Sequence, residues 1–213
     1  MKLKVCGMRD SENLRELFDQ VNPDFVGFIF HPESPRYFLD GSEDIPDELP
    51  LEKRTGVFVN NSMEDIVGEA EYFDIRNIQL HGSESPEFCR MLREKGFTII
   101  KAFGLKSEDD FQNLEDYKAV CDFFLFDTKT PKHGGSGKKF NWDILDKVDI
   151  SKHYFLSGGI DLEDVDAILN LKQMPFAIDI NSRFEIEPGL KDIQKISAFK
   201  NELFNHANTQ NNG

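Results

Sequence analysis

Eight short hydrophobic runs recur at fairly even intervals along the chain. Each run is too short to form a helix, and most are continuously hydrophobic rather than alternating with polar residues. Strands that are covered on both faces have this appearance, whereas strands with one face in water alternate. The pattern therefore predicts eight buried strands, at residues 3–6, 25–30, 56–60, 77–81, 98–103, 123–127, 154–157 and 176–180.

Segments with a helical repeat lie between the hydrophobic runs. Hydrophobic residues spaced by three and four positions predict helices near residues 14–21, 63–70, 88–92, 111–117, 162–169 and 193–203. Side chains that can accept a hydrogen bond from a first-turn amide stand at or near the start of several of them. We expect these residues to act as N-caps: Ser11, Ser62, Ser85, Ser107 and Asp161. Residues 40–54 and 142–147 predict only short or irregular helices.

The alternation of strands and helices predicts parallel βα units joined by right-handed crossovers. Eight such units in 213 residues fit a single compact (β/α)8 barrel, or TIM barrel, which usually has about 250 residues. An open, doubly wound sheet has the same order of elements and is the alternative. We assign residues 1–206 to the barrel and predict that the polar, aperiodic residues 207–213 form a disordered tail.

The charge and cysteine content limit the possible partners. The chain has 39 acidic and 25 basic residues, a net charge of -14, so nonspecific binding to nucleic acid is not expected. Three cysteines at irregular spacing, Cys6, Cys89 and Cys121, predict free thiols. No hydrophobic stretch is long enough for a signal peptide or a membrane span. These features predict a cytoplasmic protein that binds no membrane, and we expect a monomer rather than a homodimer.

Reactive residues stand where the predicted strands end. In a (β/α)8 barrel the active site is built at the C-terminal ends of the strands, and here these ends include Cys6, His81, Asp127 and Asp179. Asp127 closes a very hydrophobic run, so its carboxyl group should be partly desolvated and suited to general acid catalysis. Structural explanations are also open: Cys6 as a small buried hydrophobe, Asp127 as a cap or a lysine partner, and Asp179 as a structural carboxylate.

Glycine-rich loops follow the sixth and seventh predicted strands. The first, DTKTPKHGGSGKKF at residues 127–140, is not a Walker A motif, because Lys132 and Lys139 replace its first glycine and its Ser/Thr. The second, LSGGID at 156–161, and Ser182 after the eighth strand can present backbone amides to a phosphate. Arg36, in HPESPRYF, can form a bidentate pair with a carboxylate. Solvated loops and a solvated arginine are the alternatives.

Longer segments carry a resemblance to one enzyme family. In order along the chain from Lys4 to about Phe199, they read KVCGMRDSEN, GFIFHPESPRYF, GVFVNNS, IQLHGSES, FLFDTKTPKHGGSGKKFNW, LSGGID and DINSRFEIEPGLKD. Together they resemble phosphoribosylanthranilate isomerases, enzymes of tryptophan biosynthesis. The resemblance implies a (β/α)8 barrel and an aldose–ketose isomerase that requires neither a cofactor nor a metal ion. The expected reaction is the Amadori rearrangement of N-(5-phospho-β-D-ribosyl)anthranilate to 1-(2-carboxyphenylamino)-1-deoxyribulose 5-phosphate, the third step from chorismate to tryptophan.

The resemblance also implies roles for single residues. Cys6 matches the general base and Asp127 the general acid of the family, and Arg36 matches the residue that holds the anthranilate carboxylate. Other residues expected to bind substrate are Gly135, Gly137, Gly158, Gly159 and Ser182 at the phosphate, with His81 and Asp179 as further candidates. One position departs from the family: Ser182 is followed by Arg183, where a glycine is common.

Two other functions are compatible with the predicted fold. One is a different phosphosugar isomerase or epimerase, and the other is a protein that binds a phosphoribosyl ligand without turnover. The similar histidine-pathway isomerase has an aspartate at the position of Cys6, and the epimerases require metal ligands that this sequence does not supply at a recognisable spacing. The presence of both Cys6 and Asp127 argues against a protein that only binds.

Overall fold

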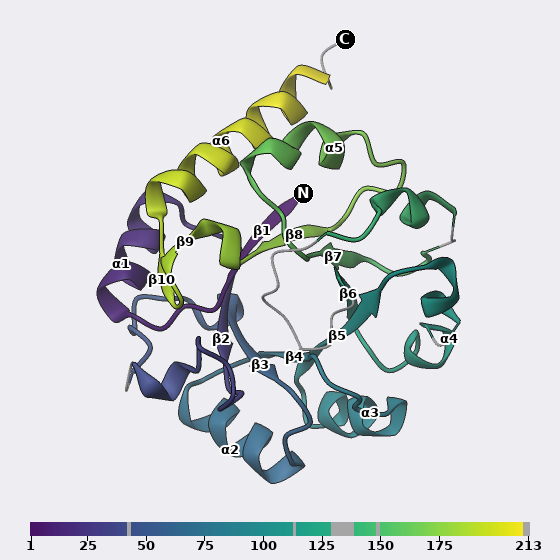
Figure 1. The fold of residues 1–213 in the computed structure, drawn as a ribbon. Coiled ribbons are helices and arrows are strands. Elements are labelled where there is room, and N and C mark those ends of the chain that lie inside the picture. The colour runs from purple at the N-terminus through teal and green to yellow at the C-terminus, as the bar shows by residue number, and fades with distance from the viewer. Residues whose placement is uncertain (42–43, 113, 129–138, 148–149, 211–213) are drawn as a thin grey trace.

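A computed structural model describes residues 1–41, 44–112, 114–128, 139–147 and 150–210, with side chains described up to residue 205. Eight parallel strands form a closed barrel in their order along the chain (Figure 1). The first strand pairs with both the second and the eighth, so the open sheet is excluded and the predicted TIM barrel is confirmed. The strands are β1 (Lys2–Cys6), β2 (Phe25–Ile29), β3 (Arg54–Phe58), β4 (Asn77–Leu80), β5 (Thr98–Leu105), β6 (Phe123–Thr128), β7 (Tyr154–Leu156) and β8 (Ala177–Ile180).

Helices surround the ring of strands (Figure 1). The α-helices of the described residues are α1 (Ser11–Gln20), α2 (Met63–Tyr72), α3 (Pro86–Glu94), α4 (Leu114–Tyr117), α5 (Val165–Leu169) and α6 (Ile193–Gln210). Short 3-10 helices complete the crossovers: η1 (Phe38–Asp40), η2 (Leu51–Lys53), η3 (Glu108–Phe111), η4 (Trp142–Lys147), η5 (Leu162–Asp164) and η6 (Ser182–Phe184). The weakly patterned segments 40–54 and 142–147 thus form only 3-10 turns where they are described, as predicted.

The helix starts follow the predicted caps with one exception. Ser62 and Ser85 accept hydrogen bonds from the amides of the third residue of α2 and α3, at 3.1 and 3.2 Å. Ser11 was predicted to cap the first helix, which is wrong: Asp10 is the cap, and its Oδ1 accepts from the Asn13 amide at 2.7 Å. An aspartate one residue earlier places its carboxylate over the first-turn amides, so Ser11 is already helical. At the other end, α6 continues to Gln210, inside the stretch predicted to be a tail.

Two hydrophobic layers decide where a ligand can enter. A large outer core lies between the strands and the helices, and a smaller cluster occupies the barrel interior. Aromatic residues at or just before strand starts pack on that inner cluster, with ring centroids of Phe25 and Phe155 5.3 Å apart and those of Phe123 and Phe176 4.8 Å apart. The inner cluster comprises Ile100, Ala102, Leu125, Phe155 and Ala177. Aromatic side chains therefore fill the N-terminal end of the barrel.

The same strands become polar toward their C-terminal ends. Side chains two residues apart on a strand share a face, so Leu125 and Asp127 face the barrel interior together, as do Ala177 and Asp179. The first of each pair belongs to the inner hydrophobic cluster, and the second is a buried carboxylate. This gradient places the polar groups of the interior at the C-terminal end, where barrel active sites are built.

Candidate active site

Asp127 is the second-to-last residue of β6 and is only 8% exposed. Its Oδ2 lies 3.2 Å from Nε2 of His81, and its Oδ1 accepts a hydrogen bond from the Thr128 amide at 2.7 Å. Gly158 approaches from the loop after β7, where a β-carbon would lie 2.7 Å from Asp127 Oδ1 and 2.5 Å from Thr128 Oγ1. The carboxyl group is therefore held by the Thr128 amide and by His81, and the loop after β7 approaches it so closely that only glycine fits at position 158.

A chain of buried polar side chains leads away from His81 across the barrel. Nδ1 of His81 lies 3.0 Å from the side-chain nitrogen Nε2 of Gln79. Oε1 of Gln79 accepts a hydrogen bond from Lys4 Nζ at 2.8 Å, and Lys4 also donates to Asp179 Oδ2 at 2.9 Å. Lys4, Gln79 and Asp179 are almost completely buried. Burial alone would lower the pKa of Lys4, but the charges and hydrogen bonds of Asp179 and Cys6 together outweigh burial and raise that pKa, so Lys4 is an ammonium group.

Cys6 ends β1 beside this ammonium group. The thiol is a further hydrogen-bond partner of Lys4, and a β-carbon at Gly27 would lie 2.7 Å from its sulfur, so the neighbouring strand must have glycine there. Burial raises the pKa of the Cys6 thiol, while the positive charges of Lys4 and Lys191 oppose the increase. The ligand-free site thus favours the thiol, although two cations lie near enough to stabilise a thiolate.

Arg36 lies beside the segment that follows Cys6 and is engaged by a carboxylate. Its Nε donates to Glu185 Oε1 at 2.8 Å, and its Nη2 donates to Glu185 Oε2 at 2.6 Å. Among the described residues, none accepts from Nη1, so the end of the guanidinium group remains available. A β-carbon at Gly7, which has φ of +77°, would lie 2.8 Å from Arg36 Cδ, and this contact places Arg36 next to the β1 end.

Glu185 and Lys191 lie on a small hairpin that the sequence analysis did not predict. Its strands β9 (Glu185–Glu187) and β10 (Leu190–Lys191) follow β8 and pair antiparallel. Lys191 Nζ donates to Glu185 Oε1 at 2.6 Å and to Asn181 Oδ1 at 2.7 Å. The Asn13 side chain binds both the amide and the carbonyl of Lys191, which attaches the hairpin to α1.

Opposite charges and burial set the proton affinities of this pair. Burial alone would raise the pKa of Glu185, but hydrogen bonds from Arg36 and Lys191 hold it below its usual value. Burial lowers the pKa of Lys191 to about 8, even though Glu185 opposes that decrease. Lys191 is therefore the described lysine whose protonation is most sensitive to pH near neutrality.

The loops proposed to hold phosphate are described only in part. Gly158 and Gly159 have φ of +96° and +70°, and their amides have no acceptor among the described residues. Ser182 begins η6 after β8. Gly135 and Gly137 lie outside the described residues. Arg183, at the position where the family commonly has glycine, is exposed to solvent.

Ion pairs of Lys139 lie at the end of the glycine-rich segment 127–140. Lys139 is exposed and forms ion pairs with Asp164 at 2.7 Å and with Glu163 at 3.6 Å. These carboxylates belong to η5, the turn that follows the Gly158–Gly159 loop. Lys139 thus fastens one end of the loop to the neighbouring crossover.

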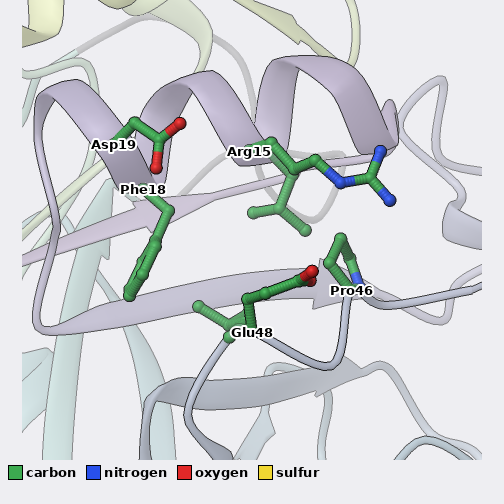
Figure 2. A pocket seen from close by; sticks show the side chains of 7 residues that line it. Arg15, Phe18, Asp19, Pro46 and Glu48 are labelled. Atoms are coloured by element: carbon green, nitrogen blue, oxygen red, sulfur yellow. The ribbon is translucent and has the colours of Figure 1, made fainter.

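A separate hollow lies on the outside of the barrel (Figure 2). It is formed by α1 and residues 46–49, with Phe18 on one wall and Arg15, Asp19 and Glu48 at its polar edges. None of the predicted site residues lines it. The hollow is thus distinct from the strand ends that carry the reactive groups.

Several polar site residues escaped the sequence analysis. Lys4 and Gln79 stand two positions before Cys6 and His81, so strand alternation places each pair on one face and could have identified both. Glu185 and Lys191 have no comparable signal, because their hairpin is too short for a periodic pattern.

Among the described residues, no cluster of three or more His, Cys, Asp or Glu side chains suits a metal ion. No helix in the described ranges has the length and hydrophobicity needed to cross a membrane.

Comparisons with known proteins point to one family. The family model described as N-(5'phosphoribosyl)anthranilate (PRA) isomerase matches residues 3–202. The N-(5'-phosphoribosyl)anthranilate isomerase of Phocaeicola vulgatus is 44% identical over 204 residues, which cover 95% of this chain and 98% of that protein. A crystal structure of phosphoribosyl anthranilate isomerase from Thermotoga maritima is 36% identical, with a TM-score of 0.82 and coverage of 96% and 99% of the two chains. A phosphoribosyl anthranilate isomerase in complex with reduced 1-(o-carboxyphenylamino)-1-deoxyribulose 5-phosphate is 32% identical, with a TM-score of 0.79 and the same coverage.

Proposed function

The chain belongs to the N-(5'-phosphoribosyl)anthranilate isomerase family, and we propose that Cys6 and Asp127 act as the general base and general acid of its reaction. The protein is an isomerase of tryptophan biosynthesis that carries out the Amadori rearrangement of N-(5-phospho-β-D-ribosyl)anthranilate. The observation that carries the proposal is the placement of the two groups. Both are buried at C-terminal strand ends, and both adjoin the Lys4, Gln79 and His81 network of the barrel interior.

The proposed chemistry uses each group once. Asp127 donates a proton to the furanose ring oxygen, and the ring opens to a Schiff base. Cys6, as a thiolate, then removes the proton from C2′, and the enolamine that forms tautomerises to the ketose. Lys4 and Lys191 support this step, because their charges reduce the cost of forming a thiolate at a buried cysteine. Asp127 on β6 and Cys6 on β1 approach the substrate from different strands, which suits an acid and a base that act on different atoms.

Arg36 binds the anthranilate carboxylate in this proposal. Glu185 occupies the Nε and Nη2 edge of the guanidinium group, and Nη1 is the group left for substrate. Glu185 therefore orients Arg36 rather than neutralising it completely. We expect Arg36→Met to raise KM about tenfold or more, the scale of a lost charged hydrogen bond. An unchanged KM would exclude Arg36 from substrate binding.

Backbone amides hold the phosphate in this proposal. Gly158, Gly159 and Ser182 follow β7 and β8, the usual phosphate position in these barrels. The amides of both glycines have no acceptor among the described residues, which supports the assignment because they remain free to donate to a phosphate. Gly135 and Gly137, which lie outside the described residues, are proposed to bind the same phosphate.

Asp179 and His81 complete the proposed substrate contacts. Asp179 Oδ1 is buried and has no hydrogen-bond partner among the described residues, so a substrate hydroxyl can donate to it. Burial raises the pKa of Asp179, with Lys4 opposing the increase. His81, 18% exposed at its side chain, borders the substrate while it contacts Asp127.

The test is an assay of wild type, Cys6→Ala and Asp127→Asn, in which the fluorescence of the anthranilate-containing substrate decays as indole-glycerol-phosphate synthase consumes the product. Each variant should lower kcat by at least about 10²-fold, the usual contribution of a general acid or base. Cys121→Ala is the matched control, since Cys121 is also a free, buried cysteine. Turnover above about half of the wild-type value in either variant would remove the residue from its role.

The site and the surface also support proposals about the state of the protein. We propose that it works as a monomer, because its most exposed large hydrophobic side chains, Tyr72 and Ile186, lie on separate elements, α2 and β9. We further propose that it works in the cytoplasm. The three cysteines are free thiols, and free thiols persist in a reducing compartment such as the cytoplasm. Sedimentation of the purified protein at several concentrations tests the first proposal, and fractionation of the cells that make it tests the second.

A further inference from the structure

The side chain of Gln79 connects Lys4 to His81 in the barrel interior, and its partners fix which end of its amide group accepts and which end donates. Its Oε1 lies 2.8 Å from Lys4 Nζ, and its Nε2 lies 3.0 Å from His81 Nδ1. Lys4 is an ammonium group with three donors and no acceptor. The oxygen of the Gln79 amide must therefore face Lys4, and its NH₂ group must face His81.

The orientation of Gln79 decides which nitrogen of His81 carries the proton. A proton on Nδ1 would oppose the amide hydrogens of Gln79, so Nδ1 accepts and the proton of the neutral ring lies on Nε2. Nε2 is the nitrogen that lies 3.2 Å from Asp127 Oδ2. His81 thus donates to the carboxyl group of Asp127, near the end of β6. Lys4 thus fixes the orientation of the Gln79 side chain, and the Gln79 side chain in turn fixes the tautomer of His81.

A donor at this point has a definite effect on Asp127. Its Oδ1 already accepts from the Thr128 amide at 2.7 Å, so the two donors serve both carboxylate oxygens. A carboxyl group that gives up a proton gains negative charge, and donors that point at it stabilise the product of that step. The other tautomer of His81 would present a lone pair instead, which would hold the proton on Asp127 rather than favour its transfer.

We propose that Gln79 is a positioning residue of the isomerisation, which keeps His81 in its Nε2–H form so that His81 donates to Asp127 as Asp127 releases its proton to the furanose oxygen. Gln79 contacts neither Asp127 nor, in this assignment, the substrate. It acts through His81 and is itself oriented by Lys4. The catalytic part of the inference rests on the proposed role of Asp127, whereas the tautomer of His81 does not.

The tautomer can be measured without any reaction. Nitrogen-15 NMR of the imidazole of His81, in ligand-free protein labelled at histidine, distinguishes a protonated from an unprotonated ring nitrogen. Wild type should show the proton on Nε2. Gln79→Glu keeps the size of the side chain and the contact with Lys4 but offers His81 only acceptors, so Nδ1 should become protonated. Gln79→Met removes the donor without adding an acceptor, so the Nε2–H tautomer of His81 should no longer be more populated than the Nδ1–H tautomer.

The same variants should lower kcat about tenfold, the scale of one hydrogen bond to a charged group, and should leave KM within about twofold because substrate contacts remain. Asn77→Leu is the matched control. Asn77 is a buried amide two residues earlier on β4, and it donates only to the carbonyl oxygens of Glu52 and Arg54. It should change neither the His81 tautomer nor kcat.

The outcomes separate the two levels of the inference. Wild-type protein with the proton on Nδ1, or Gln79 variants that keep the wild-type tautomer, would overturn the assignment of His81. A changed tautomer together with a wild-type kcat would overturn the positioning role. If Asp127→Asn stayed active while the tautomer shifted as expected, the proposed acid would be wrong and the structural assignment of Gln79 would remain.

Discussion

The two reactive groups of the site are supported in different ways. Cys6 lies among charged side chains: Lys4, which pairs with Asp179, and Lys191, which pairs with Glu185. Asp127 is held by His81, a backbone amide and the close approach of Gly158. We refer to these as the base side and the acid side. A buried thiol must be helped to become an anion, whereas a carboxyl group needs only donors that accept its new charge, so the base side alone requires buried cations.

This difference has a consequence for stability. Buried ion pairs contribute little beyond the cost of desolvating their charges, but removing one partner leaves an uncompensated charge and is strongly destabilising. Removing a hydrogen-bond donor or a close contact from the acid side should reduce the free energy of unfolding by less. The base side should therefore respond to substitution mainly through folding stability, and the acid side mainly through turnover.

The largest expected effect is a loss of folding stability when a charge of the base side is removed. Lys4→Met leaves Asp179 buried without its cation and should reduce the free energy of unfolding by about 3 kcal/mol or more. Urea denaturation at neutral pH measures this loss. The double variant Lys4→Met with Asp179→Leu removes both charges and should recover most of the stability, because no charge then remains unpaired. A double variant as unstable as Lys4→Met would mean that packing, not charge, sets the cost.

A second prediction follows from Lys191, whose pKa burial lowers to about 8 from the ordinary 10.5. Between these two pH values the unfolded chain keeps a proton on this lysine that the folded protein has released, so the contribution of Lys191 to stability should rise with pH across this window. The rise should reach about 3 kcal/mol, from 1.36 kcal/mol per pKa unit. Urea denaturation at steps across the window tests this as a difference: the stability of wild type relative to Lys191→Met should rise with pH, because opposing contributions, such as that of the Cys6 thiol whose pKa burial raises, are present in both proteins. Lys2→Met, at a lysine half exposed at the surface, should keep the wild-type slope.

The acid side should lose turnover rather than stability. Gly158→Ala adds a β-carbon within 2.7 Å of Asp127 Oδ1 and of the Thr128 amide, so Asp127 must move. We expect kcat to fall by about 30-fold or more, since small misplacements of a catalytic group have large effects. Gly96→Ala is the matched control, because Gly96 has the same φ of +96° but has no atom within 4 Å of a new β-carbon. Equal losses of kcat in both variants would assign the effect of Gly158 to backbone strain.

The smallest effect is expected outside both sides. Lys139 is itself exposed and pairs with the buried carboxylate of Asp164 and with exposed Glu163, so solvent reaches its ammonium group and weakens the attraction. Lys139→Ala should change both substrate affinity and the free energy of unfolding by less than about 1 kcal/mol. Titration of a product analogue and urea denaturation would check this. A larger loss of affinity would mean that Lys139 takes part in binding the phosphate.

The sequence predicted the parts of the site that follow from barrel geometry. Once eight buried strands are recognised, their C-terminal ends must meet, and Cys6, His81, Asp127 and Asp179 are found by reading where each strand stops. The hydrophobic pattern is a local property, so strand positions could be read to within about two residues. The N-cap of α1 was misplaced because Asp10 and Ser11 are both good caps, and local composition does not choose between neighbours.

The supporting groups were not predicted for a physical reason. Lys4, Gln79, Glu185 and Lys191 are polar residues, and a hydrophobic pattern assigns polar residues to the surface. Their burial becomes favourable only when each finds a partner. The hairpin of β9 and β10 was also missed, because strands of three and two residues have no measurable period. Partners, not propensities, decide where such residues lie.

The sequence by itself determined the order of the strands, the hydrophobic interior and the two groups that are proposed to exchange protons with the substrate. Only the tertiary structure decided which charges meet. Lys4 pairs with Asp179 across 175 positions of the chain, and Arg36 pairs with Glu185 across 149. Both pairs depend on the closing of the barrel between β1 and β8, whose register sets Lys4 beside Asp179. The strength of an ion pair depends on distance and burial in space, and neither quantity is written in the spacing of residues along a chain.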